Sequence, residues 1–261
     1  MRVLVTFAVD EEFAPWRKMR HFRSIDYDGL RLWKTSSEGV EITALVTGIG
    51  TQAAAQAMGL MMSMADEDRY FDICISSGLA GALKKGLHTG DIIAPQVLLA
   101  ERAHADLTSD PLRVDDDLRQ RALGTGAICS DCLFTTEKVL VKAQQKQICA
   151  SRAQSVDMES FEIVKQAKEW GARTLVLRAI SDLAEEDLPI DFNRTISKEN
   201  QISVVKVVME LAKNPFVLPR LLRFGKQSRY AAQRLANFLD EYVQALSALD
   251  PGHLKQQAVA R

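Results

Sequence analysis

The chain has 261 residues, 47% of them hydrophobic, and its 33 basic and 34 acidic residues give a formal net charge of −1. This length allows one large domain with a substantial buried core. The balanced charge lacks the global signature of a nucleic-acid-binding protein, so we expect no nucleic-acid partner. Four cysteines are too few for a disulfide scaffold, which favours a reducing, cytoplasmic compartment.

The N-terminal segment predicts a buried strand over 3–9, followed by a helix over 12–20. The apolar run is too short, and too soon followed by three acids, to be a signal peptide. Strands over 31–35 and 41–46 flank a turn and predict a hairpin. No apolar run reaches the length of a transmembrane helix.

The sequence Thr47-Gly48-Ile49-Gly50 predicts a glycine-rich turn that leads into a helix over 51–58. Glycine permits close approach of the backbone to a ligand, and the start of the helix offers unpaired N–H donors. This turn is therefore a candidate part of a binding site.

The middle of the chain continues the mixed α/β pattern. A strand over 72–77 is expected to end at a turn containing Gly78 and Gly81, and another strand begins near Gly90. Residues 105–125 predict a solvated excursion with a short helix. A strand over 127–130 follows, with Phe134 in the loop after it.

Cys129 and Cys132 have the spacing of a zinc or redox pair. No second pair and no paired histidines follow, so we expect neither a metal site nor a cofactor.

The segment 175–182 carries the strongest functional signal, because an apolar run typical of a buried strand ends on the carboxylate of Asp182. Ligands of open α/β sheets collect at the carboxyl ends of parallel strands, so Asp182 is expected to point into a cleft. The preceding segment, Val156-Asp157-Met158-Glu159-Ser160, leads into a helix over 161–167, which a turn at Gly171 joins to the Asp182 strand.

The C-terminal part predicts an amphipathic helix with one apolar face. That face consists of Leu235, Phe238, Leu239, Tyr242, Val243 and Leu246. Residues 250–252 are expected to end the helix, and 255–261 to form a frayed tail. We therefore divide the chain into a catalytic domain over 1–212 and a C-terminal helical extension over 213–250.

The chain resembles the purine and uridine phosphorylase superfamily, above all its nucleosidases, in four segments that occur in the same order. These segments are Ala8 to Glu12, Gly78 to Leu83, Val156 to Ser160 and Arg178 to Asp182. Those enzymes cleave the N-glycosidic bond of 5′-substituted adenosines such as methylthioadenosine and adenosylhomocysteine. The resemblance covers roughly residues 1–205. It implies an α/β domain with a central mixed, twisted sheet flanked by helices, a nucleoside substrate and a homo-oligomer. The stretch 218–225 looks like the hopanoid-associated members, which implies adenosylhopane as substrate.

Asp182 is the candidate general acid, because protonation of the purine at N7 neutralises the departing base. This role requires burial, or a donor such as Ser181, to adjust the pKa of Asp182. Alternatively, Asp182 caps a following helix or pairs with Arg178, four residues earlier on the same strand face.

Glu12 matches the nucleosidase position that orients the attacking water, with Asp10 and Glu11 as rivals. The alternative for all three is that they are first-turn acids favourable to the helix dipole. Glu159 fits a carboxylate that accepts the 2′- and 3′-hydroxyl protons of ribose.

Further substrate contacts are assigned by the same resemblance. Met158 would touch the apolar face of the sugar, and Phe134 would stack on adenine, or Leu133 after a one-residue shift. The remaining assigned contacts are Val9, Gly78 and Ala80. Met158 and Phe134 could instead be ordinary core residues.

The nucleophile divides the superfamily. Its phosphorylases carry Arg and Ser after the strand at 72–77, whereas this chain has no arginine ahead of Gly78 and has Leu79 where the serine would lie. Phosphate needs cationic or multiple N–H partners, so water is favoured. The amides of Gly48 and Gly50 keep a phosphate-dependent purine nucleoside phosphorylase open. A noncatalytic protein that binds adenosyl compounds is the second alternative.

Between Lys206 and Arg234 the sequence has seven basic residues and one acid, Glu210, interleaved with leucine and phenylalanine. Such a segment can lie on an anionic membrane. We expect a peripheral membrane contact through 215–234, and the alternative is packing on the domain or on a second subunit.

Overall fold

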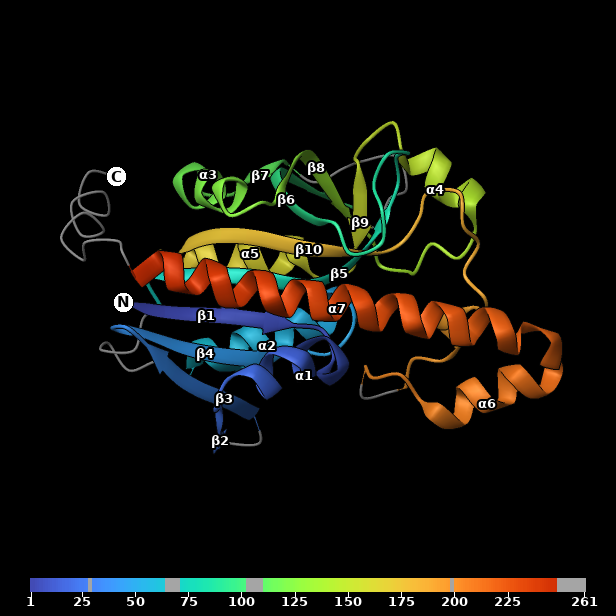
Figure 1. The fold of residues 1–261 in the computed structure, drawn as a ribbon, viewed down its shortest axis with the longest axis horizontal. Coiled ribbons are helices and arrows are strands. Elements are labelled where there is room, and N and C mark those ends of the chain that lie inside the picture. Colours follow the sequence, from blue (N-terminus) through green and yellow to red (C-terminus); the bar gives the residue numbers. More distant parts are fainter. Residues whose placement is uncertain (28–29, 64–70, 102–109, 198–199, 248–261) are drawn as a thin grey trace.

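The computed structural model describes residues 1–27, 30–63, 71–101, 110–197 and 200–247. They form one mixed sheet with helices on both faces, which confirms the predicted fold class (Figure 1). The strands are β1 (Arg2–Phe7), β2 (Arg23–Tyr27), β3 (Leu30–Ser37), β4 (Val40–Val46), β5 (Ile73–Ala82), β6 (Ile92–Ala100), β7 (Leu112–Arg113), β8 (Ile128–Thr135), β9 (Ser155–Asp157) and β10 (Arg173–Asp182). The helices are α1 (Asp10–Met19), α2 (Thr51–Ser63), α3 (Asp116–Gly124), α4 (Ala143–Cys149), α5 (Ser160–Glu169), α6 (Val204–Lys213) and α7 (Leu218–Ser247), with short 3₁₀ turns η1 (Phe192–Arg194) and η2 (Pro215–Val217).

Four parallel strands form the centre of the sheet. β1 pairs with β4 and with β5, and β5 pairs with β10. On one side β10, β6, β8, β9 and β5 close into a ring. On the other side β3 pairs antiparallel with β4, which confirms the predicted hairpin, and β2 adds a further antiparallel strand. Because parallel strands end at the same edge, the carboxyl ends of β1, β4, β5 and β10 meet there.

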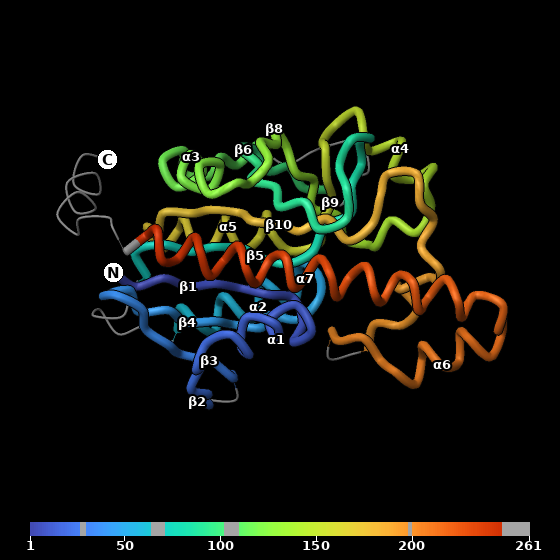
Figure 2. Tube along the Cα trace, in the orientation of Figure 1, coloured from blue at the N-terminus to red at the C-terminus, as the bar shows by residue number. Residues whose placement is uncertain are grey.

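The two faces of β1 show how the sheet is buried. Val3, Val5 and Phe7 pack toward α1 and α7, whereas Leu4 packs toward α2 and α5. This alternation is the period of two expected of a strand covered on both faces. Figure 2 shows α7 running along one face of the central strands, with α2 and α5 behind them.

The apolar face predicted for the C-terminal helix is confirmed in α7. All six residues of the predicted face, Leu235 to Leu246, are at least 93% buried. The hydroxyl of Tyr242 donates a hydrogen bond of 2.9 Å to the carbonyl of Leu118 in α3. No described helix is long and apolar enough to cross a membrane. The predicted helix end at 250–252 and the tail at 255–261 lie outside the described residues.

Three local predictions are wrong. β5 continues through Gly78 to Ala82 instead of turning, because β10 pairs with it along that length. Phe134 lies inside β8 and not in a loop. The part of the 105–125 segment that the structure describes is no solvated excursion, since β7 pairs with β6, and α3 buries Leu118 and Ala122.

Candidate functional site

The first carboxylate at the edge is Glu12, in the first turn of α1. Its Oε2 accepts a hydrogen bond from the Ala8 N–H (2.9 Å), and its Oε1 accepts one from the Leu79 N–H (2.8 Å). Burial raises the pKa of Glu12, partly offset by the Arg178 charge and by these N–H donors. Of the three rival acids only Glu12 is buried, since Glu11 is exposed and Asp10 pairs with Arg17.

Glu159 lies across the edge, immediately before α5. Its Oε1 accepts a hydrogen bond of 2.8 Å from the Gly50 N–H, so the predicted glycine-rich turn reaches the site. Burial raises the pKa of Glu159 to about 8, the neighbouring Asp157 charge adds to the rise, and Arg178 opposes it. Burial and the Asp157 charge thus both favour the protonated form of Glu159.

Arg178 connects these groups from the middle of β10. Its Nη2 lies 2.6 Å from Asp157 Oδ2, with 1% of each side chain exposed, and 3.9 Å from Glu159 Oε2. The guanidinium also donates to the Ser77 carbonyl and to the hydroxyl of Ser160. The predicted alternative in which Arg178 pairs with Asp182 is therefore wrong.

Gly78 is required where Arg178 and Glu12 meet. Its φ of +143° and its surroundings both exclude a side chain, because a Cβ there would lie 2.1 Å from Arg178 Nη1 and 2.9 Å from Glu12 Oε2. The absent side chain lets the cation and the acid approach the backbone of β5.

Asp182 ends β10 beside Gly81, two residues along β5 from the Leu79 that binds Glu12. A bulge between Ile180 and Asp182 interrupts the two-residue alternation, which is why the i−4 pairing with Arg178 fails. No described helix begins directly after Asp182, so the helix-cap alternative is also wrong.

Both carboxylate oxygens of Asp182 have donors. The hydroxyl of Ser181 donates to Oδ1 at 2.6 Å, and the ammonium of Lys146, in α4, lies 2.5 Å from Oδ2. Asp182 and Lys146 are both buried, at 7% and 1% exposure. The sequence carries no signal for Lys146, since α4 has no apolar periodicity that would place this residue inside.

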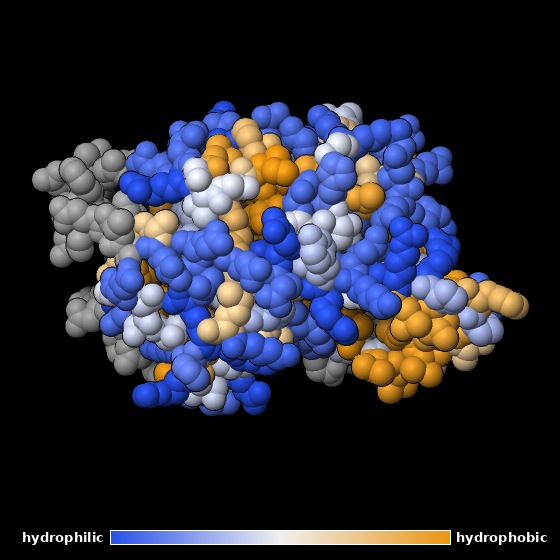
Figure 3. Space-filling model, in the orientation of Figure 1, coloured by the Kyte–Doolittle hydropathy of each residue, from blue (hydrophilic) through white to orange (hydrophobic). Residues whose placement is uncertain are grey.

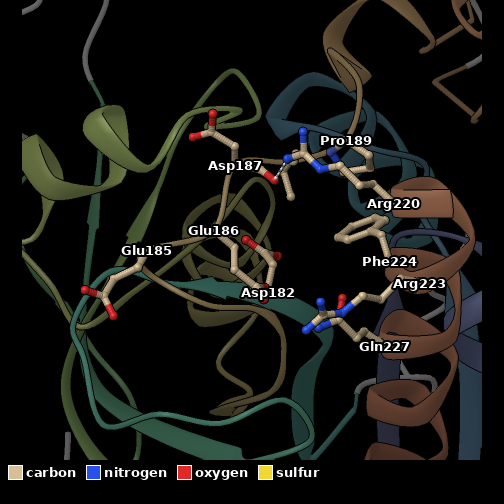
Figure 4. A pocket seen from close by; sticks show the side chains of 10 residues that line it. Asp182, Glu185, Glu186, Asp187, Pro189, Arg220, Arg223, Phe224 and Gln227 are labelled. Atoms are coloured by element: carbon tan, nitrogen blue, oxygen red, sulfur yellow. Dashed lines mark hydrogen bonds between the residues drawn. The ribbon is translucent and has the colours of Figure 1, made fainter. Parts of the chain in front are cut away.

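A cavity of about 300 Å³ opens beside Asp182. Asp182 and Glu186 border it on one side, and Arg223, Phe224 and Gln227 of α7 project toward them from the other (Figure 4). Residues of the predicted C-terminal extension therefore line the same cavity as the candidate acid.

The remaining predicted contacts are distributed around this edge. Met158 is partly buried, with its Cε 3.9 Å from the position of a Cβ on Gly50. Val9 is partly buried before α1, and Ala80 is buried in β5. Phe134 is 1% exposed and packs with Leu83, Ala153 and Val156.

Leu133 belongs to a different cluster, with Leu98 and Val176, so it faces the other side of β8 and cannot replace Phe134. The thiol of Cys129, which the sequence places in a metal-like spacing, accepts a hydrogen bond from Arg119. Within the described ranges no three His, Cys, Asp or Glu side chains gather as they would around a metal ion.

The family model of the phosphorylase superfamily matches residues 2–213. The chain belongs to this superfamily. Among solved structures, futalosine hydrolase of Helicobacter pylori superposes with a TM-score of 0.71 at 18% identity, over 94% of this chain and 100% of that one. A methylthioadenosine/adenosylhomocysteine nucleosidase of Campylobacter jejuni superposes with a TM-score of 0.71 at 16% identity and the same coverage.

A third solved structure is the methylthioadenosine/adenosylhomocysteine nucleosidase of Neisseria meningitidis in complex with methylthio-immucillin-A. It superposes with a TM-score of 0.70 at 18% identity, over 94% of this chain and 99% of that one. At these identities the superpositions establish the shared fold.

Proposed function

We propose that this protein is an enzyme that hydrolyses the N-glycosidic bond of a 5′-substituted adenosine and releases adenine. The observation that carries the proposal is the convergence of Glu12, Glu159 and Asp182 at one edge of the sheet, each buried and each with a defined donor. Glu12 and Glu159, whose pKa values are raised by burial, are acids of the kind typical of functional sites. This also favours catalysis over noncatalytic ligand binding.

The three acids divide the work. Asp182, supported by Ser181, delivers a proton to purine N7 as the bond to C1′ breaks. Glu159 binds the ribose hydroxyls, and Glu12 takes a proton from the attacking water as positive charge develops on the sugar. The wall of the nucleoside pocket is proposed to include Val9, Met158, Gly78, Ala80 and Phe134.

Water is the proposed nucleophile because the N–H donors and the arginine that could bind phosphate are already bonded to other groups of the protein. The Gly50 N–H donates to Glu159, and the Gly48 N–H donates to the Ala8 carbonyl. Arg178 is committed to Asp157 in the interior. A phosphate dianion would have to displace these protein partners.

The substrate class includes apolar 5′ substituents. α6 has no buried residue, and α6, η2 and the start of α7 expose a contiguous apolar surface (Figure 3). This apolar surface consists of Val204, Val205, Val208, Met209, Phe216, Leu218 and Leu222. Basic residues of α7 adjoin it, and together they support a peripheral contact with an anionic membrane, from which an adenosylhopane-like substrate would be taken.

The proposed function is tested by release of adenine from methylthioadenosine and adenosylhomocysteine in phosphate-free buffer. Glu12→Gln should lose nearly all turnover, whereas the matched control Glu11→Gln, which changes an exposed neighbouring acid, should retain it. Absence of adenine release by the unmodified protein from these nucleosides and from a longer-chain 5′-alkylthioadenosine would refute the proposal.

A further inference from the structure

Lys146 is a fully buried cation on a short polar helix. In α4, Lys146 is the single buried residue, and its side chain is 1% exposed. A buried ammonium is costly unless it is paired and hydrogen-bonded, so the fold must satisfy it completely. Nothing in the local sequence of α4 requires a lysine at this position.

The ammonium has three hydrogen-bond acceptors. These are Asp182 Oδ2 at 2.5 Å, the Leu183 carbonyl at 2.7 Å and the Glu186 carbonyl at 3.1 Å. A charged lysine has three N–H donors, and each finds one acceptor here. Lys146 is therefore held in its protonated form, and it fixes both the carboxylate and the segment that follows β10.

The state of Asp182 follows from its donors. Oδ2 accepts from Lys146, and Oδ1 accepts from the Ser181 hydroxyl. A carboxyl group that accepts at both oxygens, once from a cation, is an ionised carboxylate and has no proton of its own to give to a leaving base. The proton for the leaving base must then come from another group.

We propose that Lys146 is a positioning residue that holds Asp182 and stores the proton that Asp182 delivers. As the C1′–N9 bond breaks and its electrons move into the base, a proton passes from Lys146 Nζ to the ionised Asp182 at Oδ2, and a proton passes from the Asp182 carboxyl group to purine N7. Asp182 is therefore ionised before and after the step, and Lys146 becomes a neutral amine. Lys146 is then reprotonated from water. The inference rests on the proposed function.

Other charged groups near the pair have their own partners or face the cavity. Lys142, immediately before α4, pairs with Asp187, Lys85 pairs with Glu185, and the carboxylate of Glu186 accepts from the Leu183 N–H. From α7, Arg220 donates to the Asp187 carbonyl, and Arg223 lines the cavity. Gly81, which pairs with Asp182 across β5 and β10, carries no charge.

The test compares Lys146→Met with Lys146→Arg and with the control Lys142→Met, which changes an exposed lysine immediately before the same helix. For Lys146→Met, kcat at neutral pH should fall at least about 10-fold with a KM near that of the unmodified enzyme. Its activity optimum should move to lower pH, because an Asp182 without a cation can take up its own proton there. Lys146→Arg should keep the ion pair yet not recover kcat, since guanidinium does not release its proton.

A pH profile of Lys146→Met that is lowered but not shifted would overturn the inference, and so would full activity of Lys146→Arg. If Lys146→Met does not fold, the kcat and pH profile of Lys146→Arg decide the question. The unmodified enzyme is assayed first. Its failure to release a base counts against the proposed function, whereas normal turnover by both Lys146 variants counts against Lys146 alone.

Discussion

Arg178 and Asp157 form an ion pair in the interior, with Arg178 Nη2 2.6 Å from Asp157 Oδ2 and 1% of each side chain exposed. The pair places a cation between Glu12 and Glu159 without leaving it free for an external anion. The contribution of this ion pair to the free energy of unfolding can be measured separately from catalysis.

Arg178→Met should lower the free energy of unfolding by about 3–5 kcal/mol, because it leaves Asp157 buried without its cation. The control is Arg173→Met on the same strand, whose partner Asp115 is 22% exposed. That change should cost about 1 kcal/mol. Urea unfolding of both variants measures the difference, and equal losses would show that burial does not govern the Arg178 pair.

Asp182→Asn should reduce kcat for adenine release by about 10²- to 10⁴-fold, because an amide cannot pass a proton to N7. The fold should persist, as judged by circular dichroism and thermal unfolding. Asp117→Asn, at an exposed position in α3, serves as the control. Turnover of the Asp182 variant close to that of the unmodified protein would remove Asp182 from the mechanism.

Stability should depend on pH through Glu159. The folded protein retains the proton of Glu159 up to its pKa of about 8, whereas the unfolded chain releases it near 4.5. Unfolding therefore releases a proton between these values, and stability falls as pH rises through this window by up to about 1.4 kcal/mol per unit. Glu159→Gln should flatten this slope in urea unfolding at pH 5 to 8, and Glu169→Gln at an exposed site of α5 should not. Parallel slopes for the two variants would contradict the raised pKa.

The membrane proposal predicts cosedimentation with anionic liposomes at low salt that weakens as salt is raised. Each basic residue near the surface contributes up to about 1 kcal/mol. Changing Arg220, Arg223 and Lys226 to Gln should weaken binding, whereas neutralising Lys165 and Lys168 of α5 should not. Equal binding of both variants, or no binding by the unmodified protein, would contradict the membrane proposal. The apolar surface of α6 would then bind a different partner.

The sequence was sufficient to predict elements whose apolar pattern allows only one kind of structure. An apolar run that ends on Asp182 predicts a buried strand delivering an acid to the sheet edge, and β10 confirms it. The stripe from Leu235 to Leu246 likewise predicts the buried face of α7. Whether the extension from residue 213 is a separate unit, and whether the protein is a homo-oligomer, remain predictions.

The sequence failed where long-range packing overrides local preference. Gly78 indicates a turn by itself, but β10 holds it in a strand and the glycine serves Arg178 and Glu12 instead. Lys146 approaches Asp182 from a polar helix 36 positions earlier, and no local pattern indicates that contact. The bulge at the end of β10 changes which side chains share a face, and only the strand pairing reveals it.

Water, activated beside Glu12, is the proposed nucleophile that attacks C1′ of a 5′-substituted adenosine. The most direct test is turnover of methylthioadenosine in ¹⁸O-labelled water, with and without phosphate, followed by mass spectrometry of the sugar under conditions that suppress exchange at the anomeric carbon. We expect methylthioribose to carry one ¹⁸O atom at C1 and to form at the same rate in both buffers. Turnover only with phosphate, with a sugar 1-phosphate as product, would show that phosphate and not water is the nucleophile.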